Sequence, residues 1–137
     1  MREIKFRGMT LENNKMVYGD LLLYRVLPVI FDEDKEQHEV KANTVGQFTG
    51  LQDKNGKDIY ENDIVKYSLG PANESCRIVR FGEFLVDCSG QEYPPCKGTG
   101  FYFERGNQYD EISFDCTIEI IGNKFENEGL WEEVKNA

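Results

Sequence analysis

The chain has 137 residues, of which 39% are hydrophobic and 12% aromatic. This composition is sufficient for a domain with an apolar core and argues against wholesale disorder. Sixteen Lys and Arg against 25 Asp and Glu give a net charge of −9. That balance argues against non-specific wrapping of nucleic acid, which needs an excess of basic residues. No apolar run reaches the roughly 20 residues that span a bilayer as a helix.

The N-terminus and the cysteines point to a reducing compartment. Residues 1–7 alternate charged and apolar side chains and lack the apolar core of a secretory signal. The four cysteines, at positions 76, 88, 96 and 116, include no Cys-x-x-Cys pair. Reduced thiols are therefore favoured over disulfides or a zinc site. We expect a cytoplasmic protein without membrane association.

Short strands dominate the N-terminal half. Alternation of apolar and polar residues predicts a first strand over residues 4–7. A second strand is expected over 16–24, bent or bulged at Gly19, and a third over 44–51. Residues 32–43 are densely charged and predict a loop or flexible excursion.

Turn signals organise the middle of the chain. Asn55-Gly56 predicts a hairpin with a type I′ turn, in which both central residues have positive φ. A tight turn at Asn62-Asp63 leads into a strand over residues 64–67. After a polar loop, two further strands are expected at 76–81 and 84–88.

The C-terminal third alternates loop, strand and one helix. Five Gly and Pro residues in the segment 89–100 predict a loop. Late strands are expected at 101–103 and 116–121. The apolar spacing in 126–134 predicts a short helix whose Trp131 packs back on the sheet.

This order of turns and short strands is typical of a small SH3-like barrel. The predicted fold is mainly β: an SH3-like barrel-type meander with additional N-terminal strands and a short C-terminal helix. Residues 1–137 form one domain, built either around one core or as two packed lobes. The lobes would be an N-terminal β lobe at 1–58 and a barrel-type lobe at 59–137.

Motifs that carry chemistry are incomplete in this sequence. Residues 50–58 approach a phosphate-binding loop, but the glycine spacing is one residue too long and Asp58 replaces the Mg²⁺-binding Ser or Thr. A calcium loop in this region lacks its bidentate Glu, because Ile64 stands there. Gly98-Thr99-Gly100 lacks the third glycine of a dinucleotide fingerprint. A hairpin turn explains the first segment without any ligand.

The single histidine, His38, lies between Glu36 and Glu39. In a charged loop it is expected to be a solvated side chain, whereas general bases are held on ordered walls. No nucleophile pattern accompanies it. We therefore predict that the protein is not an enzyme and has no catalytic, cofactor-binding or metal-binding residues and no cofactor.

Basic residues alternate with apolar ones on two predicted strands: Arg2, Lys5, Arg7, Arg77 and Arg80. A basic sheet face with aromatic neighbours is one way in which small barrels bind nucleic acid. Cross-strand pairing with Glu and Asp explains the same pattern, and the net charge of −9 opposes phosphate binding. Nucleic-acid binding is therefore the alternative, and ordinary strand residues are the favoured interpretation.

Three blocks of the sequence resemble the YopX family of phage and prophage proteins, in the family's order: Ile4–Gly8 with Val17–Leu21, then Val45–Val65, then Glu119–Asn127. The chain departs from the family at Asn62, where Gly is usual, and at Met16, where Trp is common. Asn tolerates the left-handed conformation better than other non-glycine residues, so Asn62 fits a positive-φ turn.

The resemblance implies a mainly β fold, phage origin and the cytoplasm of an infected or lysogenic bacterium. It implies no biochemical activity and no catalytic or ligand residues. We expect a non-catalytic protein-interaction module that binds a host or phage protein, or a homo-oligomer. Aromatic residues such as Phe101-Tyr102-Phe103 are the expected anchors.

Overall fold

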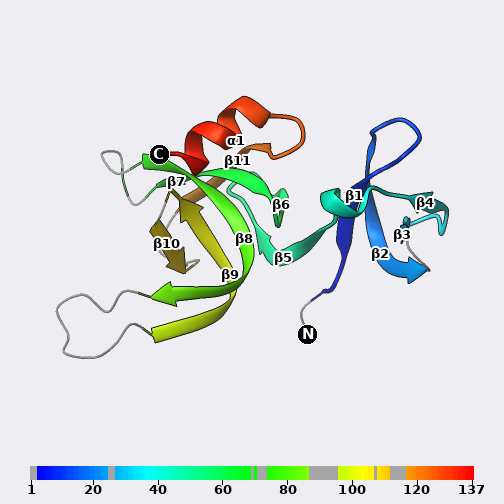
Figure 1. Cartoon of the computed structure of the whole chain (residues 1–137), viewed down its shortest axis with the longest axis horizontal. Helices are drawn as coiled ribbons and strands as arrows, with labels where there is room; N and C mark the ends of the chain where they lie inside the picture. The colour runs from blue at the N-terminus through cyan, green and yellow to red at the C-terminus, as the bar shows by residue number, and fades with distance from the viewer. Residues whose placement is uncertain are drawn as a thin grey trace. The chain divides into compact units, whose positions relative to one another are not determined.

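The computed structural model describes residues 3–24, 27–68, 70, 74–86, 96–106, 108–111 and 117–137. Contacts between Cα atoms divide the chain into two units, one of Met1–Leu51 with Asp58–Tyr60 and one of Gln52–Lys57 with Glu61–Ala137. Each unit contains one antiparallel sheet (Figure 1). Among the described residues no helix has the length and apolar character needed to cross a bilayer.

The first unit is a sheet with the strand order β4-β3-β2-β1-β5-β6. Its strands are β1 (Phe6–Met9), β2 (Met16–Tyr24), β3 (Leu27–Phe31), β4 (Gln37–Glu39), β5 (Gly46–Gln52) and β6 (Asp58–Tyr60). A 3₁₀ turn, η1 (Ala42–Thr44), precedes β5. The strands expected at 4–7, 16–24 and 44–51 are thus confirmed within two residues at each end.

One core cluster of this unit comprises Val17, Ile30 and Val40, with Leu21 and Val45 packed against them. These residues come from β2, β3 and the segment after β4. Within a strand, alternate residues point to the same face, so Val17 and Leu21 of β2 both point to the core. Leu21 lies directly opposite Ile30 in the β2–β3 register, which puts both on the core side.

Gly19 allows β2 to pass close to β3. A Cβ atom at Gly19 would lie 1.8 Å from the carbonyl oxygen of Phe31, and its φ is +155°. Any side chain at this position would therefore push the two strands apart.

The prediction of a loop over residues 32–43 is wrong for half of the segment. The chain turns at 32–36 and then forms β4, which pairs with β3, and η1 follows. The charged composition of the segment gave no strand signal, because β4 is a three-residue edge strand and edge strands carry polar side chains.

The second unit is a sheet with the strand order β10-β9-β8-β7-β11. Its elements are β7 (Asp63–Ser68), β8 (Glu74–Val86), β9 (Cys96–Arg105), β10 (Gln108–Glu111), β11 (Thr117–Asn123) and the helix α1 (Glu128–Lys135). Figure 1 shows β8 and β9 continuing as a two-stranded ribbon beyond their pairing with β7 and β10. The strands expected at 64–67 and 101–103 are confirmed.

Helix α1 closes the core of the second unit. Trp131 and Val134 are buried against Ile64 and Ile78, and Leu130 packs against the same cluster. The predicted C-terminal helix with a buried tryptophan is therefore confirmed. Its amphipathic spacing was visible in the sequence because Trp131 and Val134 lie one turn apart.

Two strand predictions in this unit need correction. Residues 76–81 and 84–88 were expected to be separate strands, but 74–86 form the single strand β8. The predicted loop 89–100 is wrong from residue 96 onward, where β9 begins, and residues 89–95 lie outside the described part. Glycines that suggested a loop instead lie in the β8–β9 ladder, where Gly82 pairs with Gly100.

The mainly β fold with one short C-terminal helix is confirmed. Within the described residues the second sheet is open, with β10 and β11 at its edges, and no closed barrel forms. The SH3-like detail of the prediction stays a prediction.

The hairpin at Asn55-Gly56 is confirmed, but its turn type is not the predicted one. Gly56 has φ of 80°, whereas Asn55 is not among the residues with positive φ. The Gly56 N–H donates to the Asp53 carbonyl at 3.0 Å, and the Asp53 N–H donates to the Lys57 carbonyl at 2.8 Å. This pattern is a type I turn followed by a left-handed residue, not a type I′ turn.

The turn at Asn62-Asp63 is confirmed. Asn62 has φ of 75°, as expected of an asparagine where a glycine is usual. Its N–H donates to the Val79 carbonyl and its own carbonyl accepts the Lys124 N–H. The turn thus ties β7 to β8 and to the segment after β11.

Candidate functional site

Exposed apolar side chains gather on the β2–β3 hairpin. Leu22 lies opposite Val29, and Leu27 and Phe31 flank Val29 at alternate positions, so these four share one face of the hairpin. Leu22 and Leu27 are 49% and 41% exposed, and the other two are half-buried. We call these four residues the hairpin face. Leu23, 74% exposed, lies on the opposite face.

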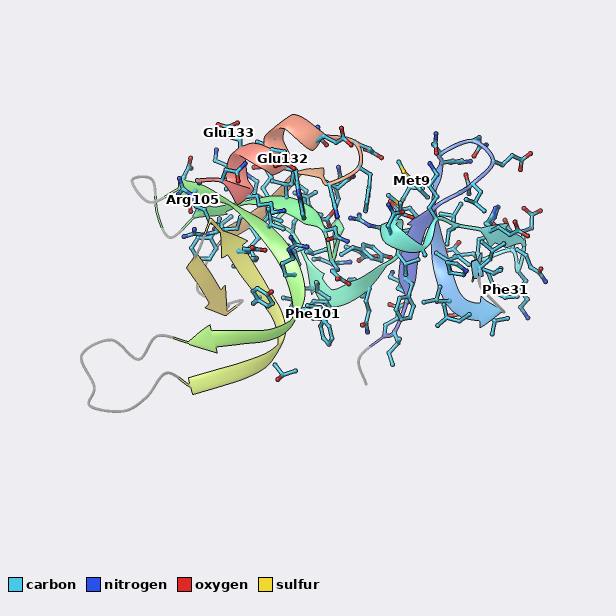
Figure 2. All side chains as sticks on the ribbon, viewed as in Figure 1. Met9, Phe31, Phe101, Arg105, Glu132 and Glu133 are labelled. Carbon is cyan, nitrogen blue, oxygen red and sulfur yellow. The ribbon has the colours of Figure 1, made fainter. Side chains whose placement is uncertain are left out.

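Polar residues border the hairpin face. Asp20 lies opposite Phe31 on one side, and on the other side Gln37 and Glu39 of β4 lie opposite Phe31 and Val29. All three polar residues are exposed. Figure 2 shows Phe31 among the side chains of this part of the sheet. An apolar centre with a polar rim is the usual anatomy of a protein-binding surface.

The cations of β1 and its flank are committed to the packing of the first unit. Lys5 Nζ lies 2.6 Å from Asp58 Oδ2 and 4.6 Å from the centroid of the Phe48 ring. Arg7 is 5% exposed, and its guanidinium lies 5.0 Å from the Tyr60 ring centroid. The hydrogen bond to Asp58 raises the pKa of Lys5, which keeps it charged in this cluster.

Burial also affects the phenol of this cluster. Tyr60 is 2% exposed, and burial, with the negative charge of Asp58 as a lesser cause, raises its pKa far above the usual range. Its ring contacts Tyr18 and Phe48, with centroids 5.4 and 5.6 Å away. Tyr60 therefore acts as the neutral aromatic centre of the cluster.

The second pair of predicted basic residues is similarly engaged. Arg80 Nε lies 2.8 Å from Glu104 Oε2, and its guanidinium lies 4.8 Å from the Trp131 ring centroid. The guanidinium of Arg77 lies 5.8 Å from the Tyr67 ring centroid. These interactions favour the interpretation as ordinary strand residues.

The described cations are divided between the two units. Lys5 and Arg7 belong to the first sheet and its flank, and Arg77 and Arg80 belong to the second. Arg2 lies outside the described residues. Within its own unit each described cation contacts a carboxylate or an aromatic ring, as the favoured interpretation expects.

The expected aromatic anchors are largely internal. Phe103 is fully buried and makes an edge contact with Tyr67, with centroids 5.3 Å apart, so its prediction as an exposed anchor is wrong. Phe101 and Tyr102 are half-buried. Phe101 packs on the exposed ring of Phe81, 4.8 Å between centroids.

His38 is not a loop residue. It lies in β4 with its side chain 27% exposed, and Nε2 lies 2.8 Å from Asp32 Oδ2. This hydrogen bond, together with backbone N–H groups, lowers the pKa of Asp32. The expectation of a solvated loop histidine is therefore wrong, because the hairpin brings Asp32 and His38 together across a turn.

The remaining motifs have structural roles. The near phosphate loop at 50–58 is a hairpin, as expected, and its Asp58 pairs with Lys5. Gly98-Thr99-Gly100 lies within β9. Cys76 is a free, half-buried thiol, as predicted, and the other three cysteines lie outside the described side chains.

The YopX protein family matches residues 5–132 of the chain, which is nearly its whole length. No curated protein matches the sequence.

Proposed function

The chain belongs to the YopX family, and from this premise we propose that it is a phage or prophage protein with a non-catalytic role in protein interaction. The proposed contact surface is the hairpin face. Burial of a Leu side chain stabilises a complex by about 1.5–3 kcal/mol when the side chain is fully exposed beforehand. Leu22 and Leu27, each nearly half exposed, are the energetic centre of this surface.

The clustering of these residues is the observation that carries the proposal. Two of the eight large apolar side chains that the described residues expose, Leu22 and Leu27, share the hairpin face. Single exposed apolar residues are ordinary, whereas a group bordered by polar residues marks an interaction surface. The carboxylates of Asp20 and Glu39 on the rim favour a partner with basic side chains around an apolar centre.

The non-catalytic role is supported by the partners of the ionisable groups. Lys5 and Asp53 have shifted pKa values, and each shift has a structural cause within its own unit. Lys5 pairs with Asp58, and Asp53 caps a turn. Shifted groups at active sites serve reacting atoms, while these two serve packing.

The test compares a double substitution on the hairpin face with a single substitution at a leucine whose side chain is similarly exposed. Leu22→Ser combined with Leu27→Ser removes the apolar centre of the hairpin face, and Leu11→Ser removes a 45% exposed leucine elsewhere in the unit. We expect the wild-type protein and Leu11→Ser to capture the same protein from nuclease-treated bacterial lysate, and the double variant to lose it.

Light scattering of the purified proteins distinguishes the two kinds of partner. A wild-type dimer that the double variant converts to a monomer identifies the partner as a second copy. Equal capture by all three proteins, with no change in mass, would contradict the proposed surface. Capture that nuclease abolishes would favour nucleic-acid association instead.

A further inference from the structure

Three metal-ligating groups converge at the turn between β3 and β4. A carboxylate oxygen of Asp32, a carboxylate oxygen of Glu36 and a ring nitrogen of His38 all lie within 4.8 Å of one another. One imidazole with two carboxylates is a donor set suited to Zn²⁺ and related divalent transition metals. We infer that Asp32, Glu36 and His38 form a zinc-type metal-binding site.

The turn holds Asp32 in the orientation that a ligand needs. Its Oδ1 accepts the N–H groups of Asp34 and Glu36 at 2.9 and 3.0 Å, which leaves Oδ2 directed at His38 Nε2, 2.8 Å away. Backbone bonds from Asp32 to Glu36 and from Lys35 to Asp32 close the same turn. Such outer hydrogen bonds orient a carboxylate ligand before the metal arrives.

Asp53 caps a second turn of the chain in the same way as Asp32, but the Oδ2 atoms of the two aspartates have different partners. At Asp53 the Oδ2 atom accepts the backbone N–H of Ile120 at 3.0 Å, a partner that no metal can displace cheaply. At Asp32 the corresponding oxygen faces an imidazole nitrogen, which is itself a metal ligand. The turn alone requires only Oδ1, so the Oδ2–His38 contact is an addition to the turn.

A hollow borders His38, one of the three proposed ligands, and brings further carboxylates near it. It has a volume of about 440 Å³ and is lined by His38 together with Glu12 and Glu39. Zinc with three protein ligands keeps a fourth position for water or another group. The two additional carboxylates make the hollow attractive to a cation.

Metal binding requires only a small rearrangement. Ligand atoms around tetrahedral Zn²⁺ lie about 3.3 Å apart, given metal–ligand distances of about 2.0–2.2 Å. The Asp32–His38 contact of 2.8 Å therefore opens by about half an ångström. Glu36 is exposed, so its side chain is free to rotate into position.

The test is a titration of the full chain with Zn²⁺ in competition with a chromophoric chelator. We expect one ion bound per chain. Glu36→Gln and His38→Gln should each weaken binding at least about tenfold, and glutamine at 38 keeps a hydrogen-bonding group for Asp32. Glu33→Gln removes one charge from the same turn without removing a ligand, so it should retain the wild-type affinity.

Imidazole resonances provide a second readout, since His38 is the single histidine. In the proton NMR spectrum its ring signals should shift or broaden as Zn²⁺ is added. Co²⁺ in place of Zn²⁺ should give visible absorption without a thiolate charge-transfer band. Unmoved imidazole signals, a thiolate band, or an equal loss of affinity in Glu33→Gln and Glu36→Gln would each overturn the inference.

Discussion

Asp32 and Asp53 cap two hairpin turns by the same set of hydrogen bonds, although they lie in different units. In each turn, Oδ1 of the aspartate accepts the N–H groups of the residues two and four positions later, at 2.9–3.0 Å. In each turn the aspartate N–H also donates to the carbonyl four residues later. The environments differ, because Asp53 is buried and Asp32 is half-buried.

Replacement of Asp53 should destabilise the protein. Asp53→Asn keeps an oxygen for the turn but presents an NH₂ group to the backbone N–H of Ile120, which then lacks its acceptor. We expect a loss of about 1–3 kcal/mol in the free energy of unfolding, measured by urea denaturation at neutral pH. Asp32→Asn should cost less, because Asp32 is more exposed and faces an adaptable imidazole. Equal losses would contradict this account.

The effect of Asp53→Asn should depend on pH. Burial opposes ionisation of Asp53, but the backbone N–H groups of Ile120, Lys57 and Asn55 outweigh it and lower its pKa below the ordinary 3.8. A carboxyl group with a lowered pKa stabilises the fold above its unfolded-state pKa, and this contribution disappears as the pH falls through the folded-state pKa.

Denaturation of wild type and Asp53→Asn from pH 7 down to pH 3 checks this prediction. The difference in the free energy of unfolding between the two proteins should be constant from pH 7 to about pH 5 and should become smaller below about pH 4. A difference that grows with acidification would show that the sign is wrong.

The two Asp-capped turns each have one residue with left-handed φ, and the glycine of one turn and the lysine of the other should be exchangeable at this position. Gly56 has φ of 80° and Lys35 has φ of 62° at the equivalent place. A side chain costs about 1–2 kcal/mol in this conformation, and no atom lies within 4 Å of a Cβ built at Gly56. Gly56→Lys should therefore lose about 1 kcal/mol from the backbone alone.

Lys35→Gly should gain up to about 1 kcal/mol, reduced by the greater entropy of glycine in the unfolded chain. The double variant should lie near wild type in thermal melting. Since the sites lie in different units, their effects should add, and a large excess loss in the double variant would contradict the shared turn type.

The position of the 53–57 hairpin was predictable from Asn-Gly, but its turn type was not. The type follows the Asp53 carboxylate, whose Oδ1 accepts the N–H groups of Asn55 and Lys57. The Asn-Gly signal alone does not include this side chain, and the same bonds form at Asp32 without an Asn-Gly pair. The glycines at 98 and 100 also led to a wrong prediction. They suggested a loop, but they lie in β9 and pair with residues of β8.

The candidate surfaces were only partly foreseeable. The apolar stretch from Leu21 to Phe31 was evident, but strand alternation alone does not show which face stays exposed. The pairing of Ile30 with His38 across β3 and β4 decides that His38 meets Asp32. Dense charge around His38 suggested solvation, and a turn closed by side-chain hydrogen bonds was not apparent from composition.

Gly19 should tolerate no side chain. In Gly19→Ala the new Cβ would meet the carbonyl oxygen of Phe31, at a position of positive φ. We expect a loss of at least about 2 kcal/mol in chemical denaturation. Gly129→Ala is the matched control: it lies in α1 with open space around it, and alanine there should gain up to about 1 kcal/mol. Wild-type stability of Gly19→Ala would refute the close approach of β2 and β3.

Trp131 should contribute to stability both by its burial and by cation–π contacts with two basic side chains. The indole is 3% exposed, and the Arg80 guanidinium and Lys124 ammonium lie 4.8 and 5.5 Å from its centroid. Trp131→Ala should cost about 3–5 kcal/mol in urea denaturation followed by far-ultraviolet circular dichroism. Lys124→Gln should cost about 0.5–1 kcal/mol in the wild-type background.

The double variant separates the two contributions. With alanine at 131, Lys124→Gln should cost less than in the wild-type background, because the nearer of the two rings that attract the ammonium is gone. If the lysine substitution costs the same in both backgrounds, the ammonium acts through groups other than the indole, such as the Phe125 ring 5.9 Å away.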